Sequence, residues 1–466
     1  DRRQRQMCIR DRVAFDLEAP AKLLTPRPTP LRNKIVRKKG TGTSHQIKRI
    51  TGFTGTGTGG VGNIHPGIAD STYTQFGQIN YLRGPKISYA GDNKTFAYKQ
   101  FSLSDAVPFS AQFQGAGYQD IRQLSQTSVL YASMLMEERM LLMGRGQSSD
   151  GFSGALAAPS TTGVTATARA KTATETGLAS GTYYIKITAD AGSFGESPAS
   201  AVITVTGVTT GQVIDVAFGS TFSDIAQALG YKVYAGTTNA DASLFYQGRV
   251  GSSAATFTVG ALALATTGAV SPGATDTSFS ALGYDGILPT ILANASNAPG
   301  TVSRLNGAFS NSNPGVEFQN IFAALYDTVK ADPDEILFNG ADRKQLSDSI
   351  KGASNSNYKL HIAQEDLGGV VLGDVVTGLQ NEVTGKGINL VVHPWMPQGN
   401  AAVLSYTLPI PDTNVSEVWS VFNTQDYMAI EWPVTQLAFE VSSYWNGTFV
   451  CYAPSWNGAL TGIKAA

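Results

Sequence analysis

A glycine-rich loop is the first pattern in the chain that could bind a ligand. Gly57, Gly59 and Gly62 fit the G-x-G-x-x-G spacing with which dinucleotide-binding proteins approach a pyrophosphate. That chemistry requires a helix N-terminus directly after the glycines, because its N–H groups bind the phosphates. Here Pro66 follows, no helical pattern begins, and no Lys-Ser/Thr pair completes a phosphate loop. The tract Thr51–Gly62 is therefore predicted to be a flexible loop.

The histidines are the next candidates for acid–base or metal chemistry. The chain has four of them, His45, His65, His361 and His393, and none is paired at helical spacing. No H-E-x-x-H, C-x-x-C or EF-hand pattern occurs, so no metal site is expected. His393 directly follows an apolar run. A histidine packed in the core or at its rim is expected there rather than a catalytic base.

Two adjacent acids, Glu137 and Glu138, stand near the end of a predicted helix and could suggest paired carboxylates. Neighbouring residues on a helix point in different directions, so solvated or intersubunit ion pairs are expected instead. The stretch Gly151–Gly154 lacks the spacing of a nucleophile elbow. No catalytic, cofactor-binding or metal-binding residue is predicted, and the chain is expected to be neither an enzyme nor the carrier of a cofactor.

Charge is unevenly distributed along a chain that is nearly neutral as a whole. The 466 residues carry a formal net charge of −1. No acidic residue occurs between Glu18 and Asp70, and this stretch holds a basic cluster: Arg32, Lys34, Arg37, Lys38, Lys39, Lys48 and Arg49. Such an arm suits contact with phosphates or with an acidic partner surface. A solvated tail is equally compatible with its charge.

The cysteine count and the hydropathy pattern indicate a cellular compartment. Cys8 and Cys451 are too few and too far apart for a disulfide scaffold. No apolar run is long enough for a signal peptide or a membrane span. A protein that is soluble and intracellular when made, with no membrane partner, is expected. Asp1–Arg12 resembles translated sequencing-adapter read-through and receives no functional weight.

Hydrophobic periodicity predicts an α+β architecture. Helices are predicted over Asp120–Met143, Val316–Lys330 and Asp342–Ile350. Two β-rich runs around a Gly-Asp-Asn turn predict a long hairpin within Thr72–Phe109, and the prolines of Pro20–Pro30 predict an extended arm. Apolar runs predict C-terminal strands at Glu335–Phe338, Ile388–Val392, Ala402–Leu404, Trp419–Phe422 and Thr448–Tyr452.

The segment Ser153–Pro272 differs in composition from the chain on both sides of it. It is rich in Thr, Ala, Gly and Val and has few charges. Insertions are tolerated at exposed loop tips, so an all-β sandwich inserted in a surface loop of a larger host is predicted. Residues 165–265 resemble fibronectin type III and related immunoglobulin-like modules. Period-two runs place strands at Gly181–Thr188, Ala201–Val205 and Gln212–Phe218, and further strands are predicted at Tyr231–Tyr234 and Ala255–Val259.

Four stretches of the host share their order and spacing with a known pattern. They are the helix end and turn Glu138–Gly154, the helix–strand–helix unit Phe318–Ile350, the strand and turn Gly387–Gly399, and the last strand Gly447–Pro454. With an arm and a hairpin before the long helix, they resemble the major capsid protein of tailed phages, which has the Hong Kong 97-type fold. The resemblance skips the insert.

The resemblance implies a division of the chain into domains. An N-terminal arm (1–50) precedes a flexible loop and extended hairpin (51–110). The peripheral domain begins with the long helix (111–154), is interrupted by the inserted sandwich (155–275), continues (276–345) and ends with C-terminal strands (425–466). An axial domain occupies 346–424.

The resemblance also implies a function and its partners. Copies of the chain would assemble in the host cytoplasm, as hexamers and pentamers, into the icosahedral shell of a virion. Portal, scaffolding or decoration proteins would be partners, and the basic arm would contact packaged double-stranded DNA without sequence specificity. Two alternatives stay open: an encapsulin-like nanocompartment shell, which shares the fold, and a tail or adhesion protein, which only the sandwich supports.

Overall fold

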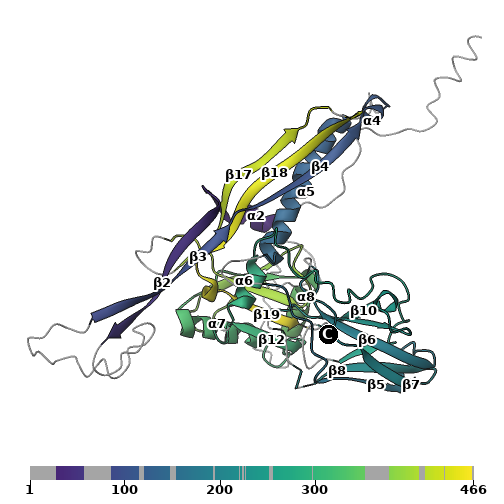
Figure 1. The fold of residues 1–466 in the computed structure, drawn as a ribbon. Coiled ribbons are helices and arrows are strands. Elements are labelled where there is room, and N and C mark those ends of the chain that lie inside the picture. Colours follow the sequence, from purple (N-terminus) through teal and green to yellow (C-terminus); the bar gives the residue numbers. More distant parts are fainter. Residues whose placement is uncertain are drawn as a thin grey trace, which may run out of the picture. The chain divides into compact units, whose positions relative to one another are not determined.

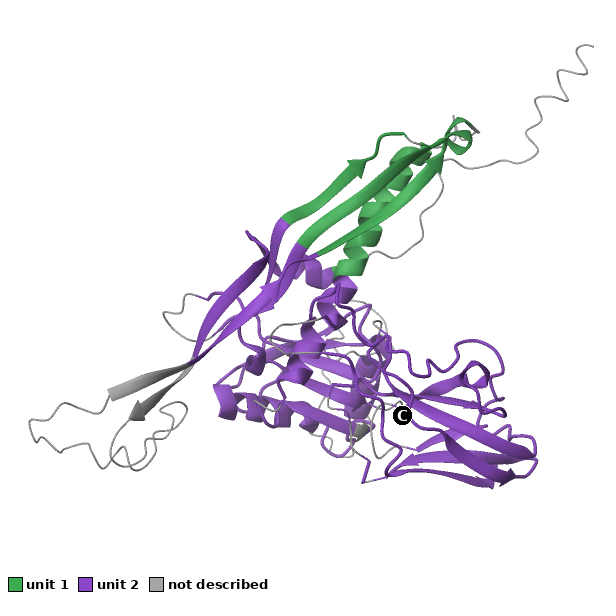
Figure 2. Ribbon diagram, viewed as in Figure 1, with its two compact units in different colours: residues 1–29, 100–137, 425–446 green, residues 30–99, 138–424, 447–466 purple. Residues whose placement is uncertain are grey.

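The computed structural model describes residues 28–56, 86–114, 120–146, 154–192, 195–219, 221–222, 225, 227–250, 256–295, 298–351, 377–408, 415–434 and 436–463. It divides into two compact units, which Figure 2 colours differently. Unit 1 includes Gln100–Glu137 and Gln425–Asn446. Unit 2 includes Pro30–Lys99, Glu138–Thr424 and Gly447–Ala466.

The longest helix is α5, Ile121–Met143 (Figure 1), which confirms the helix predicted there. It begins at a side-chain cap, because Asp120 Oδ1 accepts hydrogen bonds from the backbone N–H groups of Arg122 (3.0 Å) and Gln123 (3.2 Å). It ends at Gly144, where a Cβ would lie only 2.5 Å from the carbonyl oxygen of Tyr284. Close backbone packing therefore requires glycine at the helix end. None of the described helices is long and apolar enough to cross a membrane.

A four-stranded sheet has the strand order β1-β17-β18-β4, in which β1 runs parallel to β17. Within unit 1, the indole of Trp445 is fully buried and stacks on Phe101, with ring centroids 4.8 Å apart. Beside it Ser133 of α5 hydrogen-bonds Ser443. The strands are β1 (Val36–Lys39), β4 (Lys99–Pro108), β17 (Trp419–Glu431) and β18 (Ala438–Cys451), and the short helix α4 (Phe109–Gln114) follows β4.

A six-stranded mixed sheet in unit 2 has the order β12-β19-β16-β13-β15-β14. Helix α7 (Val316–Val329) buries Phe318, Ile321, Phe322 and Leu325, which recur at the helical period and share a core with the sheet. The predicted helices and strands of this region are confirmed within a few residues. They are α7 itself, α8 (Gly340–Lys351), β13 (Glu335–Phe338), β15 (Gly387–Val392) and β16 (Asn400–Leu404). The other elements of this region had not been predicted: α6 (Ile287–Ala293), β12 (Val302–Gly307), β14 (Gly378–Gln380) and β19 (Gly458–Ile463).

Residues 155–275, called the insert below, contain two sheets with the orders β10-β9-β6-β7 and β11-β8-β5. Period-two alternation makes one side chain of each pair point inward, as in β6, where Ile185 and Ile187 are fully buried. The inward residues of both sheets belong to one hydrophobic cluster. The strands are β5 (Val164–Ala170), β6 (Gly181–Ala189), β7 (Ile203–Val208), β8 (Gln212–Phe218), β9 (Tyr231–Gly236), β10 (Phe245–Val250) and β11 (Thr256–Val259).

The prediction of a hairpin within Thr72–Phe109 was wrong about which strands pair. Residues 86–97 form the single strand β3, which pairs antiparallel with β2 (Ser44–Thr56), so the expected Gly-Asp-Asn turn lies inside a strand. Asp92 is paired with Arg49 across this two-stranded sheet. The Gly-Asp-Asn sequence does not form a turn here, because β3 pairs along its whole length with the long strand β2. Residues 72–85 lie outside the described residues.

Two further expectations for the N-terminal part were wrong. Residues Thr51–Thr56 belong to strand β2 and not to a flexible tract, and the remainder of that tract lies outside the described residues. Pro30 begins helix α2 (Pro30–Lys34) and does not continue an extended arm. Proline is favourable in the first turn of a helix, where its missing N–H has no partner in any case.

Candidate assembly interface

The basic cluster is distributed over three elements of unit 2. Arg32 and Lys34 lie on α2, Arg37, Lys38 and Lys39 on β1, and Lys48 and Arg49 on β2. The side chains of Arg32, Arg37, Lys38 and Arg49 are half-buried, whereas those of Lys34, Lys39 and Lys48 are exposed. The structure therefore places these seven residues in folded elements and not on a free tail.

Two of the basic residues, Lys34 and Lys38, form ion pairs with acids from distant parts of the chain. Lys34 forms an ion pair with Glu335, and its Nζ lies 3.9 Å from the centre of the Tyr406 ring. Lys38 pairs with Glu417 at 2.7 Å, and this hydrogen bond lowers the pKa of Glu417. The cluster is thus partly neutralised, although the sequence around it contains no acid.

Arg49 and Asp92 form a two-bond ion pair across the β2–β3 sheet. The distances are 2.8 Å from Nε to Oδ1 and 2.5 Å from Nη2 to Oδ2. This pairing is the first cause of the lowered pKa of Asp92. The two parallel bonds fix the register of the two strands at the point where a turn had been expected.

Helix α2 is held by the carboxylate of Glu138, the residue on α5 that sequence reasoning placed in solvent or between subunits. Its Oε1 accepts a hydrogen bond from the backbone N–H of Leu31 (2.9 Å), and its Oε2 accepts one from that of Arg32 (2.8 Å). The first N–H groups of a helix have no partner within the helix. A carboxylate at this end accepts their hydrogen bonds and interacts favourably with the positive end of the helix dipole. Glu138 is 0% exposed, so the expectation of a solvated or intersubunit acid was wrong.

His393 completes this buried site. Its Nε2 lies 2.8 Å from Glu138 Oε1, and its Nδ1 accepts a hydrogen bond from the backbone N–H of Trp395 (3.3 Å). Because Nδ1 is an acceptor, Nε2 carries the hydrogen and donates it to the carboxylate. The imidazole is 1% exposed, so His393 is a packed histidine, as expected, and joins α5, α2 and the loop after β15.

The neighbouring Glu137 has separate partners. It is also 0% exposed, and its Oε2 accepts a hydrogen bond from the Tyr427 hydroxyl at 2.7 Å within unit 1. The prediction that the two acids do not converge on one site is consistent with these different partners. Their burial was missed because a Glu-Glu-Arg sequence is usually typical of a solvated helix face.

The other residues that could do chemistry are not brought together in the described part of the chain. His45 stacks on Phe422, with ring centroids 3.8 Å apart, and burial together with the charge of Lys38 lowers its pKa. His65, His361, Gly57, Gly59 and Gly62 lie outside the described residues. Among those described, no group of three or more His, Cys, Asp or Glu residues could hold a metal ion.

No protein-family model matches the sequence, and no curated protein matches it. Solved structures that the chain is similar to include phage capsids, a gene transfer agent capsid and an encapsulin complex. The capsid of Myoviridae phage XM1 is 7% identical, with coverage of 97% of this chain and 98% of that chain, and a TM-score of 0.43. The capsid of a native GTA particle is 10% identical, with coverage of 97% and 95%, and a TM-score of 0.44.

The holo-SrpI encapsulin complex from Synechococcus elongatus PCC 7942 is 7% identical, covers 100% of this chain and 96% of that chain, and has a TM-score of 0.43. The TM-scores of these three structures all lie below 0.5.

Proposed function

We propose that this chain is the major capsid protein of a tailed phage, with the Hong Kong 97-type fold. Copies of it assemble into an icosahedral shell that encloses double-stranded DNA. The β2–β3 sheet is the observation that carries this proposal, because its geometry is best explained by contact with a neighbouring copy.

β2 and β3 are strands of 13 and 12 residues that pair from Ser44 opposite Ala97 to Thr56 opposite Lys86. Among the described residues no third strand joins them. A two-stranded sheet is marginally stable in water, and unpaired strand edges are surfaces to which other chains add. Ile50, on β2, is 64% exposed in the single chain. A neighbouring subunit would supply the burial that the sheet lacks.

The exposed lysines of the basic cluster support contact with the genome. Lys39 and Lys48 are exposed, and no ion pair involving either is among those described for the resolved parts of the chain. Cations of this kind neutralise DNA phosphates without reading sequence. In the proposed virion these lysines face the packaged DNA.

The insert is proposed to be an immunoglobulin-like β-sandwich on the outer surface of the shell. Two sheets around one hydrophobic cluster support the sandwich assignment. An outer position leaves the interior to the genome. Portal, scaffolding or decoration proteins are the further partners of such a shell, which assembles in the host cytoplasm.

Negative-stain microscopy of the purified chain tests the proposal. Closed shells with nuclease-protected double-stranded DNA are expected, whereas shells that enclose a cargo protein would indicate an encapsulin-like nanocompartment. Replacing residues 51–90 by Asn-Gly keeps the Arg49–Asp92 pair and should give a folded product that forms no shells. A full-length chain that stays monomeric at high concentration would contradict the proposal.

A further inference from the structure

The insert is attached to the rest of unit 2 by more than its two chain connections. Three arginines converge on Ile225 and residues 227–229, called the docking segment below. Two of these arginines come from outside the insert, Arg145 directly after α5 and Arg304 on β12, and the third, Arg249, lies on β10.

Arg145 is the most deeply buried of the three, with 2% of its surface exposed. Its Nη2 donates to the side-chain oxygen of Gln227 (2.8 Å) and to the carbonyl of Gly154 (2.9 Å), and its Nη1 donates to the carbonyl of Gln227 (3.2 Å). Burial lowers the pKa of Arg145 to about 10, against the opposing charges of Asp285 and Asp276. A guanidinium buried in this way depends on its acceptors, and most of them belong to the insert.

Arg304 holds the same segment from the six-stranded sheet. Its Nη2 donates to the carbonyl oxygens of Ile225 (2.7 Å) and Ala228 (3.3 Å). The apolar contact beside it is equally close, because a Cβ at Gly192 would lie 2.8 Å from Met143 Sδ and 3.0 Å from Leu229 Cδ1. Gly192 of the insert thus packs between Met143 at the end of α5 and Leu229 of the docking segment, without space for a methyl group.

Arg249 belongs to the insert and connects it to a host loop, whereas Arg145 and Arg304 reach the insert from the host. Its Nη2 donates to the carbonyl of Leu229 (2.8 Å), and its Nη1 donates to the carbonyl of Gln398 (2.9 Å) in the turn between β15 and β16. The next residue of that turn, Gly399, donates its N–H to the buried carboxylate of Asp342 (2.7 Å). A single guanidinium therefore connects the docking segment to a turn that lies 149 residues after Arg249 in the chain.

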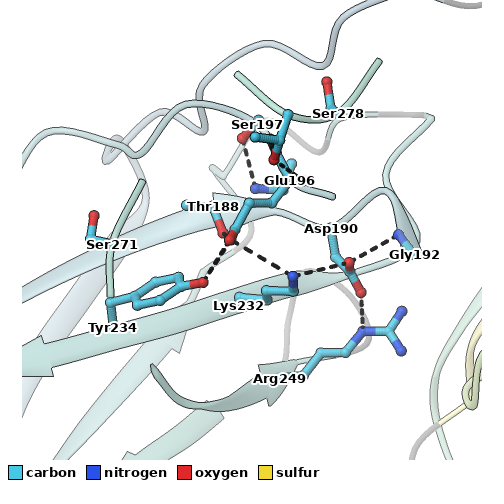
Figure 3. Close-up of polar contacts among 12 residues, drawn as sticks. Thr188, Asp190, Gly192, Glu196, Ser197, Lys232, Tyr234, Arg249, Ser271 and Ser278 are labelled. Atoms are coloured by element: carbon cyan, nitrogen blue, oxygen red, sulfur yellow. Dashed lines mark hydrogen bonds and ion pairs between the residues drawn. The ribbon is translucent and has the colours of Figure 1, made fainter. Parts of the chain in front are cut away.

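A polar network inside the insert fixes the position of Arg249 (Figure 3). The carboxylate of Asp190, 4% exposed, lies 2.8 Å from Arg249 Nε and 3.7 Å from Lys232 Nζ. Lys232 in turn lies 3.8 Å from Glu196, which accepts a hydrogen bond from the Tyr234 hydroxyl at 2.8 Å. Two acids and two bases balance each other in charge, and the ion pair with Asp190 positions the guanidinium of Arg249 beside Gln398.

We infer that the insert is an internal brace: its docking segment and Arg249 hold the end of α5, β12 and the β15–β16 turn in one arrangement. Domains within a chain usually move relative to each other unless their interface is extensive and well packed. Here the contacts are hydrogen bonds from three guanidinium groups to carbonyl oxygens, and the planar guanidinium restricts the orientations in which they form. The inference concerns the conformation of one subunit and does not depend on what the chain assembles into.

Hydrogen–deuterium exchange of the full-length chain tests the brace. Arg249→Lys keeps a positive charge beside Asp190 but cannot reach both carbonyls. Amides of residues 396–401 and of α8 should then exchange at least about tenfold faster, because the turn has lost its contact to the insert. Arg169→Lys is the matched control, since Arg169 forks to Glu175 and Asp215 inside the insert alone. It should leave exchange at 396–401 and α8 unchanged.

The reciprocal measurement uses a variant in the host. Arg304→Lys should speed exchange in residues 227–236 of the insert, although it changes no insert residue. Faster exchange across the boundary in both directions supports the brace. If each substitution changes exchange only on its own side, or if Arg169→Lys affects the host as strongly as Arg249→Lys does, the insert is an independent module and the inference is overturned.

Discussion

Glu138 and His393 lie 255 residues apart in the chain, yet their side chains form a buried pair with 2.8 Å between Oε1 and Nε2. The same carboxylate caps α2 through two backbone N–H groups. One acid therefore ties the segment that carries the basic cluster to the long helix and to the loop after β15. Helix α2 is therefore held in place by buried hydrogen bonds to Glu138, which is itself bonded to His393.

Glu138→Ala should destabilise the chain by roughly 3–5 kcal/mol, because three donors in a buried site lose their acceptor. The shift in the urea midpoint, followed by circular dichroism, measures this loss. Glu382→Ala removes an exposed acid of the same type and should change stability by no more than about 0.5 kcal/mol. Equal effects of the two substitutions would show that the Glu138 site contributes nothing.

The buried carboxylate of Asp342 predicts a specific pH dependence. Burial raises its pKa to about 6, against hydrogen bonds from Gly399 and Asn400 and the charge of Arg249. Since the folded pKa lies above the unfolded value of 3.8, the folded chain binds more protons between these values, and the stability of this site falls as pH rises through that window. Above this pH window, the ionised Asp342 carboxylate lowers the free energy of unfolding by up to about 3 kcal/mol.

Asp342→Asn keeps an acceptor for the Gly399 N–H and removes the charge. The variant should gain stability relative to the parent chain between about pH 4 and pH 7, and the difference should stay constant at higher pH. Urea unfolding of both chains at several pH values measures the difference. A difference that does not vary with pH would show that the carboxyl group is not perturbed in the folded chain.

Lys39 and Lys48 should contribute to DNA retention through charge alone. In the double variant Lys39→Gln, Lys48→Gln, particles should release DNA at lower salt, and the slope of log K against log salt should fall by roughly 2 if each lysine contacts one phosphate. Substitution of Lys171 and Lys344, exposed lysines of the insert and of α8, is the control. An unchanged slope would place Lys39 and Lys48 away from the genome.

Adjacent residues of α7 should differ sharply in their contribution to the core. Leu325 is 0% exposed and packs under the six-stranded sheet, whereas Tyr326 is 38% exposed. Leu325→Ala should cost about 2–5 kcal/mol through lost burial and the cavity that remains. Tyr326→Ala should cost less than about 1 kcal/mol. Similar losses in urea unfolding would mean that α7 is rotated relative to the arrangement described.

Local sequence patterns were sufficient to predict those helices and strands whose formation depends on residues close together in the sequence. The 3.6-residue period of α5 and α7, and the apolar runs of β13 and β15, predicted these elements within a few residues. Short-range hydrogen bonding and side-chain direction determine all of these features, so the sequence alone is informative about them.

Pairing between distant segments could not be predicted in the same way. The strand β3 was expected to fold back on itself at Gly91-Asp92-Asn93, but it pairs with β2 instead, because a full ladder of hydrogen bonds outweighs a local turn preference. Likewise the cluster from Arg32 to Arg49 has no nearby acid in the sequence, yet Glu335 and Glu417 neutralise part of it.

By itself the sequence determined the period of each helix and strand, the change of composition at the insert and the excess of positive charge near the N-terminus. Only the tertiary structure decided that Glu138 is buried, that it contacts His393, and that Arg145, Arg249 and Arg304 converge on the docking segment. The physical reason is that the cost of burying a charge depends on the partners around it. Those partners are brought in by chain segments whose positions no local pattern specifies.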